Sequence, residues 1–211
     1  MVKSMSPAPS RAASLTLIGG ELALDFANTS SGRGCPKHQE HLIEAQNVVD
    51  WAAHARVLPP EDADWLREAA KDDAELSHRL IDEALALRED IYVLCSEIAA
   101  GRFAPPERVD NLTRMYARCL AQAKLAPFQG NFIWSWRTRN APVEAVLGPI
   151  SLSALTTLLQ ADLTRVKQCQ GEECGWLFFD TTKNKSRRWC EMEVCGNRAK
   201  QKRHGAKVRG P

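Results

Sequence analysis

The 211-residue sequence predicts an α+β fold: a mostly helical N-terminal domain with a small sheet, followed by a short cysteine-rich C-terminal module. Apolar residues recur at helical spacing in several segments between positions 41 and 160. Phe132, Trp134 and Trp136 alternate with Ile133 and Ser135, which favours a strand. Four of the seven cysteines form two close pairs after position 168. A hydrophobic content of 44% is enough for one sizeable core.

The remaining elements follow in order along the chain. Residues 15–29 favour a short strand, a glycine turn and a second apolar element, and the polar residues 30–40 favour a loop. Prolines near helix starts and a glycine after a helix end indicate the limits of the helices. Helices are expected over 41–57, from Glu61 after Pro59-Pro60, over about 73–100, from Pro105-Pro106, and from Ala141-Pro142 to Leu158.

The sequence divides into three regions. Residues 1–14 are expected to form a disordered tail rich in Ser, Ala and Pro, without the apolar core of a signal peptide. Residues 15–160 form the helical domain, and residues 161–211 form the cysteine-rich module. No apolar run reaches the roughly 18 residues that a bilayer-spanning helix needs. We therefore expect a cytoplasmic protein with no membrane partner.

Charge is distributed unevenly along the chain. The 28 Lys/Arg and 26 Asp/Glu give a net charge of +2. Residues 183–211 hold ten Lys/Arg and two Glu, a net charge of +8, so the rest of the chain carries −6. An acidic body with a basic end indicates a nucleic-acid-binding tail. A solvated tail that aids solubility is the alternative interpretation.

The cysteine spacing predicts a metal site. Seven cysteines without an export signal argue against disulfides, and Cys95 and Cys119 fall in helical patterns that suit buried apolar thiols. The pattern C-x4-C-x15-C-x4-C matches the four thiolates that a tetrahedral structural zinc ion (Zn2+) takes, and it leaves no open position for catalysis. Four buried or redox-active thiols are the alternative. The predicted ligands are Cys169, Cys174, Cys190 and Cys195.

The spacer between the cysteine pairs predicts a hairpin that brings them together. Residues 176–179 are apolar, residues 180–186 form a polar turn, and residues 187–189 suit a second strand. A polar, helix-capable run follows the last cysteine. The spacer is too short to form a stable hydrophobic core without a metal ion or another cross-link, which supports metal binding. The order of knuckle, hairpin and basic C-terminal helix resembles a treble-clef-like zinc finger.

Two stretches carry a family resemblance. Residues 187–200, RRWCEMEVCGNRAK, resemble the CGNR zinc-finger signature, and residues 179–186, FDTTKNKS, fit the same pattern. Residues 19–29, GGELALDFANT, resemble the opening of the ABATE domain, which accompanies this finger in bacterial proteins. The family is regarded as stress-related transcriptional regulators whose finger is assigned to DNA by inference. The resemblance therefore implies a DNA-binding regulator. The C-x4-C first pair departs from the family pattern, and its residues Glu172 and Glu173 weaken the electrostatic case for DNA.

Basic residues around the module are the predicted contacts to double-stranded DNA. Such side chains mostly contact phosphates, and Arg198 is the candidate for reading a base or for bracing the hairpin. Asn197 is better suited to capping the C-terminal helix, which is expected over 196–204. The predicted contacts are Lys183, Lys185, Arg187, Arg188, Arg198, Lys200, Lys202, Arg203 and Lys207, with Arg209 beyond them.

Other polar residues offer weaker candidate sites. Asp25 and Asn28 lie in an apolar segment and could line a ligand pocket, although capping and turn chemistry is the favoured interpretation. His38 and His41 could coordinate a ligand, but exposed histidines are the simpler interpretation. Trp134 and Trp136 could form a binding wall, but such aromatic residues more often belong to a core. No catalytic motif is present, so we do not expect an enzyme.

Three functions remain in competition. The first is a DNA-binding regulator whose helical domain forms a homodimer or senses a small-molecule effector, since two-fold dimers are the commonest oligomers. The second is a small-molecule-binding protein or enzyme in which the zinc module is only a structural staple. The third is a zinc-stapled protein-interaction module. The charge of +8 at one end favours the first, because a staple has no need of it.

Overall fold

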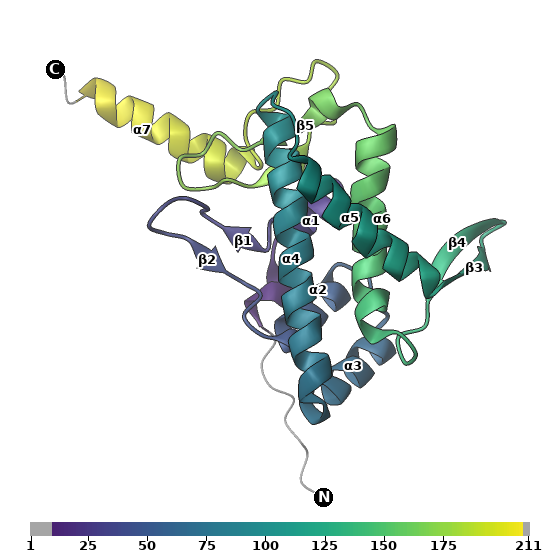
Figure 1. Cartoon of the computed structure of the whole chain (residues 1–211). Coiled ribbons are helices and arrows are strands. Elements are labelled where there is room, and N and C mark those ends of the chain that lie inside the picture. Colours follow the sequence, from purple (N-terminus) through teal and green to yellow (C-terminus); the bar gives the residue numbers. More distant parts are fainter. Residues whose placement is uncertain (1–9, 209–211) are drawn as a thin grey trace, which may run out of the picture.

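The computed structural model describes residues 10–208, without the side chains of residues 203 and 205–208. The architecture is α+β, as predicted: helices pack around the long helix α4 (Ala74–Ala99), and the described strands form three separate two-stranded antiparallel sheets (Figure 1). The first nine residues of the predicted tail, and Arg209, lie outside the described residues, whereas residues 11–14 of that tail form a 3-10 helix in which Ala12 is fully buried.

The helices of the body begin where sequence chemistry favours them. A proline stands in the first turn of three helices, where its missing N–H has no helical partner to lose. Asp73 caps α4 by accepting a hydrogen bond from the Leu76 N–H at 3.0 Å. The other helical elements are η1 (Arg11–Ser14), α1 (Leu22–Ala27), α2 (Ala45–His54), α3 (Pro60–Asp72), α5 (Pro106–Ala121) and α6 (Pro142–Gln160).

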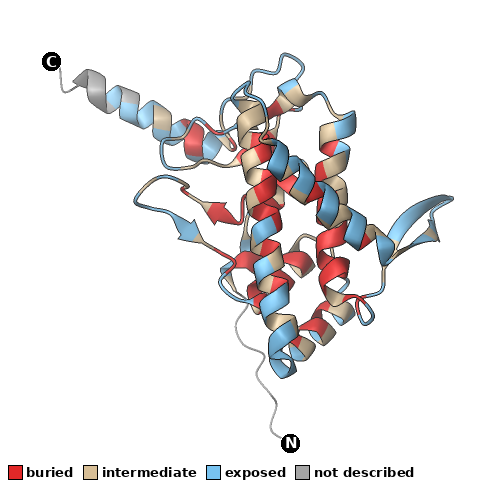
Figure 2. Cartoon of the chain, viewed as in Figure 1, coloured by how far each residue is buried: buried red, intermediate tan, exposed pale blue. Residues whose placement is uncertain are grey.

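The main core lies between α4, α6 and the shorter helices, whose inner faces are buried (Figure 2). Phe26 of α1 packs against Trp51 of α2, with ring centroids 4.9 Å apart. Cys95 and Cys119 are buried thiols, as predicted. Among the described residues, α6 is the one helix long and apolar enough to cross a membrane, but 56% of that stretch is buried inside the protein. Its packing makes it a core helix.

Two predictions for residues 15–40 were wrong. Residues 15–18 form no strand; the chain turns at Gly20, where φ is +81°, and α1 follows. The Asp25 side chain fixes this turn by accepting a hydrogen bond from the Gly19 N–H at 2.7 Å. Residues 30–40 are not only loop, because β1 (Ser30–Ser31) pairs with β2 (Gln39–Glu40).

The predicted strand at 132–136 is confirmed as β4 (Asn131–Trp136), which pairs with β3 (Ala123–Phe128). Gln129 and Gly130 join the strands with φ values of +46° and +81°, the pattern of a tight type I′ turn. This β3–β4 ribbon projects from the body beside α5 and α6 (Figure 1). Its base is fixed by Trp136, whose Nε1 donates to the Cys119 carbonyl at 2.7 Å.

The C-terminal module is built differently from the predicted hairpin. The second strand expected at 187–189 is not formed, because that segment folds around a buried aspartate described below. Instead, the hairpin encloses the first cysteine pair, with Val166 opposite Phe179 and Gln168 opposite Leu177. The predicted C-terminal helix is confirmed, and it extends further than expected. The elements are η2 (Leu163–Arg165), β5 (Val166–Gln168), β6 (Leu177–Phe179), the π-helical turn η3 (Met192–Gly196) and α7 (Asn197–Val208).

Candidate metal centre and nucleic-acid interface

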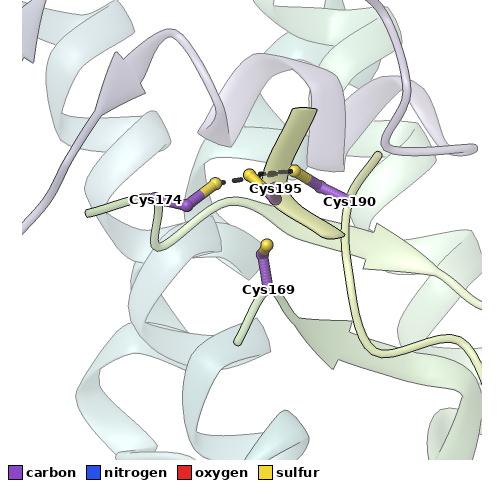
Figure 3. A group of neighbouring side chains, drawn as sticks. All are labelled: Cys169, Cys174, Cys190 and Cys195. Carbon is purple, nitrogen blue, oxygen red and sulfur yellow. Dashed lines mark hydrogen bonds between the residues drawn. The ribbon is translucent and has the colours of Figure 1, made fainter. Parts of the chain in front are cut away.

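The four predicted ligands converge on one point. All four sulfur atoms lie within 4.8 Å of one another, and Figure 3 shows the side chains turned toward a common centre. Cys190 Sγ lies 3.5 Å from Cys174 Sγ and 3.6 Å from Cys195 Sγ. Bonds of about 2.3 Å to a tetrahedral zinc ion require sulfur separations of roughly 3.8 Å. The cluster is a four-cysteine zinc site, and its four soft donors leave no position for a substrate.

Glycines permit the tight turn that carries the first cysteine pair. A Cβ on Gly171 would lie 3.2 Å from Cys174 Cβ and 3.4 Å from Cys195 Sγ, so a larger residue would crowd the metal centre. Gly175 has a φ of +74°, which favours glycine. Hydrogen bonds from the Cys174 and Cys190 thiols lower the pKa of Cys169, whereas the same close contacts and burial raise the pKa values of the other three thiols, so a single thiolate is shared within the cluster when no metal balances the charge.

Asp180 organises the loop between the cysteine pairs. Its fully buried carboxylate accepts hydrogen bonds from the Thr182 N–H at 2.9 Å, the Thr182 hydroxyl at 2.6 Å and the Arg187 N–H at 2.9 Å. Burial raises the pKa of Asp180, but these hydrogen bonds outweigh burial and lower it below its ordinary value. This role of Asp180 was not predicted from the sequence, although an aspartate two residues before a threonine is typical of an Asx turn.

Two of the predicted DNA contacts, Arg187 and Lys185, make contacts within the module. The Arg187 guanidinium stacks over Phe178, with 4.3 Å from Cζ to the ring centroid, and donates to the carbonyls of Trp189 and Cys190. Lys185 donates to Asp162 at 2.6 Å and so ties the loop to η2. Bracing the loop accounts for both cations without DNA.

The other predicted DNA contacts whose side chains the structure describes are exposed or line a cavity. Lys183 and Lys200 are exposed. Arg188, Arg198 and Lys202 line a cavity of about 440 Å³ between the first cysteine turn and the start of α7, with Trp189 in its wall. The side chains of Arg203 and Lys207 lie outside the described part of the chain.

Acidic residues of the first cysteine turn neutralise part of this basic surface. Glu172 pairs with Lys202, and both side chains are about 70% exposed. Glu173 pairs with Lys37 at 2.8 Å. Such exposed pairs contribute roughly 0–1 kcal/mol and are screened by salt. A polyanion could therefore displace the glutamates from these lysines at little cost.

Asp25 and Asn28 do not line either of the two cavities described for this structure. Asn28 is 2% exposed, and its amide both donates to the Leu177 carbonyl and accepts from the Leu177 N–H, each at 2.8 Å. Asn28 thus holds β6 of the module against the body. Burial outweighs the hydrogen bond from the Gly19 N–H and raises the pKa of Asp25 to about 6. These hydrogen bonds agree with the capping and turn interpretation of both residues.

His38 and His41 form hydrogen bonds with serine hydroxyls of the protein. His41 is 6% exposed rather than exposed as expected, and its Nε2 lies 3.0 Å from the Ser31 hydroxyl. That hydroxyl in turn accepts a hydrogen bond from Trp176 Nε1 at 3.1 Å. His38 Nε2 lies 2.8 Å from the Ser30 hydroxyl. The histidine contacts lie within the β1–β2 hairpin region, and the Trp176 hydrogen bond to Ser31 joins that hairpin to the module.

Family models cover almost the whole described chain. Residues 165–207 match the model described as "CGNR zinc finger". Residues 20–161, more than half of the chain, match the ABATE model described as "Putative stress-induced transcription regulator". Comparison with curated protein sequences gave no match. Together with the geometry of the four cysteines, the two matches show that the chain belongs to the ABATE family and ends in a CGNR zinc finger.

Proposed function

We propose that the protein is a cytoplasmic, non-catalytic transcriptional regulator whose zinc finger binds double-stranded DNA, while its ABATE domain mediates dimerisation or senses an effector. The observation that carries the proposal is the placement of α7. This helix begins directly after Gly196, next to the ligand Cys195, projects away from the body (Figure 1) and contains no acidic residue.

The cations form a surface suited to the phosphate backbone. Arg198 and Lys202 lie four residues apart and share the helix face that meets Arg188 at the cavity. Glu172 and Glu173 also line the cavity, so a phosphate would meet the Arg188 and Arg198 guanidinium groups after displacing Glu172 from Lys202. Lys200 and Lys183 add exposed positive charge outside the cavity. Contacts of this kind set affinity and orientation, and sequence preference would need base contacts from α7 or a neighbouring arginine.

A salt titration of DNA binding tests the proposal. With about five phosphate contacts, log K should fall with log salt at a slope of roughly −4 to −5. Replacing Lys200, Lys202 and Arg203 together by Ala should reduce the slope by about three, because three contacts are lost. Zinc content should be unchanged, since none of these residues is a ligand. Fluorescence anisotropy of labelled duplex DNA is the measurement.

A matched control removes the same charge from the body. Lys71, Arg79 and Arg114 are exposed and lie outside both the finger and the β3–β4 ribbon, so their joint replacement by Ala should leave the salt slope unchanged. Equal loss in both triple variants would indicate a general charge effect. Unaltered binding by the finger variant at low salt would refute DNA recognition by α7 and favour a zinc-stapled protein-interaction or small-molecule-binding protein.

A further inference from the structure

The β3–β4 ribbon carries an unusual concentration of exposed apolar side chains. A two-stranded hairpin is marginally stable by itself, and contiguous apolar patches on soluble proteins mark interaction sites. The exposed members and their exposures are Leu125 at 59%, Phe128 at 51%, Phe132 at 69%, Ile133 at 44% and Trp134 at 36%.

One side of the ribbon is uncharged along its whole length. Residues directly opposite in antiparallel strands share a face. Leu125 lies opposite Trp134, and Pro127 lies opposite Phe132, so these four side chains form what we call the ribbon face. The opposite side is less uniform, because it includes Lys124.

Contacts at the base and the turn at the tip fix the conformation of the ribbon face. Ala123 and Trp136 continue it toward the base, where Trp136 packs so closely on Gly148 of α6 that a Cβ there would approach its ring to 2.5 Å. The tight turn at Gln129-Gly130 fixes the strand register at the other end. The apolar surface is therefore preorganised, which lowers the entropy cost of binding.

We propose that the ribbon face packs against the ribbon face of a second copy of this chain. An uncharged apolar surface is complementary to itself, as a two-fold interface requires. Extension of the sheet edge to edge is less favourable, because Pro127 has no N–H to donate and so weakens the free edge of β3. Packing face to face buries the apolar side chains and leaves the free edge of β3 exposed to water.

The available area supports this partner. Large aromatic side chains bury about 150–250 Å² each, so the exposed parts of the ribbon face amount to roughly 400 Å² per chain. Two copies would bury roughly 800 Å² through these side chains alone, which is a large part of the ~1,200–2,000 Å² of a specific interface. The backbone of the ribbon can supply part of the remainder.

This inference deepens the proposed function and rests on it for the role of the dimer. The ribbon and α7 project from different sides of the molecule (Figure 1). A pair joined through its ribbons would therefore leave both basic helices free for DNA.

Sedimentation equilibrium of the full-length, zinc-loaded protein tests the interface over about a hundredfold range of concentration. We expect a dimer for the wild type. Joint replacement Leu125→Glu and Phe132→Glu places like charges on both faces and should raise the dissociation constant about tenfold or more, about 1.4 kcal/mol. The matched control, Ile43→Glu with Phe103→Glu, adds the same charge at side chains 77% and 99% exposed outside the ribbon, and should remain dimeric.

Cross-linking keeps the inference testable if the double Glu variant misfolds. A photoreactive phenylalanine analogue at position 132 should cross-link to residues 123–136 of a second chain. A monomeric wild type, a Glu variant that stays dimeric, or cross-links outside the ribbon would overturn the inference. Cosedimentation of a monomeric wild type with anionic phospholipid vesicles would instead identify the ribbon as a membrane contact.

DNA binding measured on the same samples separates the two proposals. A monomeric wild type that binds duplex DNA would overturn the ribbon interface and leave the DNA-binding function intact. A dimeric protein that does not bind DNA at low salt would refute the proposed DNA-binding function and would leave the ribbon interface supported.

Discussion

Replacing Asn28 by Ala should destabilise the protein more than any surface change, because one side chain satisfies two backbone groups of the finger. Both hydrogen bonds to Leu177 are 2.8 Å long, Asn28 is 2% exposed, and Leu177 is fully buried. Each buried group left without a partner costs about 1–3 kcal/mol, so the expected loss for the two groups is roughly 2–6 kcal/mol. Asn28→Asp should cost at least as much, because its carboxylate would face the Leu177 carbonyl.

Urea unfolding in excess zinc measures this loss. The midpoint should fall while the m-value stays constant, since the change removes contacts rather than exposing new surface. Asn140→Ala is the matched control, because Asn140 is exposed, and it should change stability by less than about 0.5 kcal/mol. A similarly small change for Asn28→Ala would refute its anchoring role and restore the interpretation of Asn28 as a ligand-pocket residue.

Three further predictions follow from single side chains. Cys190→Ser should abolish zinc binding and unfold the finger, because binding and folding are coupled, as metal analysis and circular dichroism would show. Folding raises the pKa of Asp25 to about 6, so ionisation of Asp25 lowers the free energy of unfolding of the wild type as pH rises from about 4 to 6. Over that pH range the free energy of unfolding of Asp25→Asn should rise by about 1–2 kcal/mol relative to wild type, as urea titrations would show. Glu172→Gln should tighten DNA binding roughly two- to fivefold by releasing Lys202, whereas Glu68→Gln, which releases Lys71 outside the finger, should not.

Local sequence signals predicted the elements that local chemistry determines. The limits of α4 follow from the Asp73 cap and the glycine after its end, and both were visible in the sequence. Strand β3 gave no such signal, because Lys124 and Pro127 interrupt an otherwise apolar run. Its place in a ribbon depends on pairing with β4, which is not encoded in β3 alone.

The metal site was predictable and its surroundings were not. The pairs of cysteines fixed the ligands, because short spacing places two sulfurs on one turn. The hydrogen bonds from Asn28 to Leu177 join residues 149 positions apart, so no local pattern could reveal them. The exposure of Trp134 likewise contradicts the expectation of a core residue, because it depends on how far the ribbon extends beyond Trp136.

The contacts between body and finger bear on how DNA would be read. The three residues after Cys174 each meet a different segment of the body: the Gly175 carbonyl accepts from Tyr92, Trp176 donates to the hydroxyl of Ser31, and Leu177 is held by the Asn28 amide. Because these anchors adjoin a metal ligand, the finger does not hang from a linker, and α7 takes its direction from the body. Two copies joined through a rigid ribbon would therefore present two basic helices at a fixed separation. We expect such a regulator to favour DNA with two half-sites at one spacing, as other dimeric DNA-binding proteins do. Insertion of half a helical turn of DNA between the half-sites should then weaken binding, while insertion of a full turn should weaken it less.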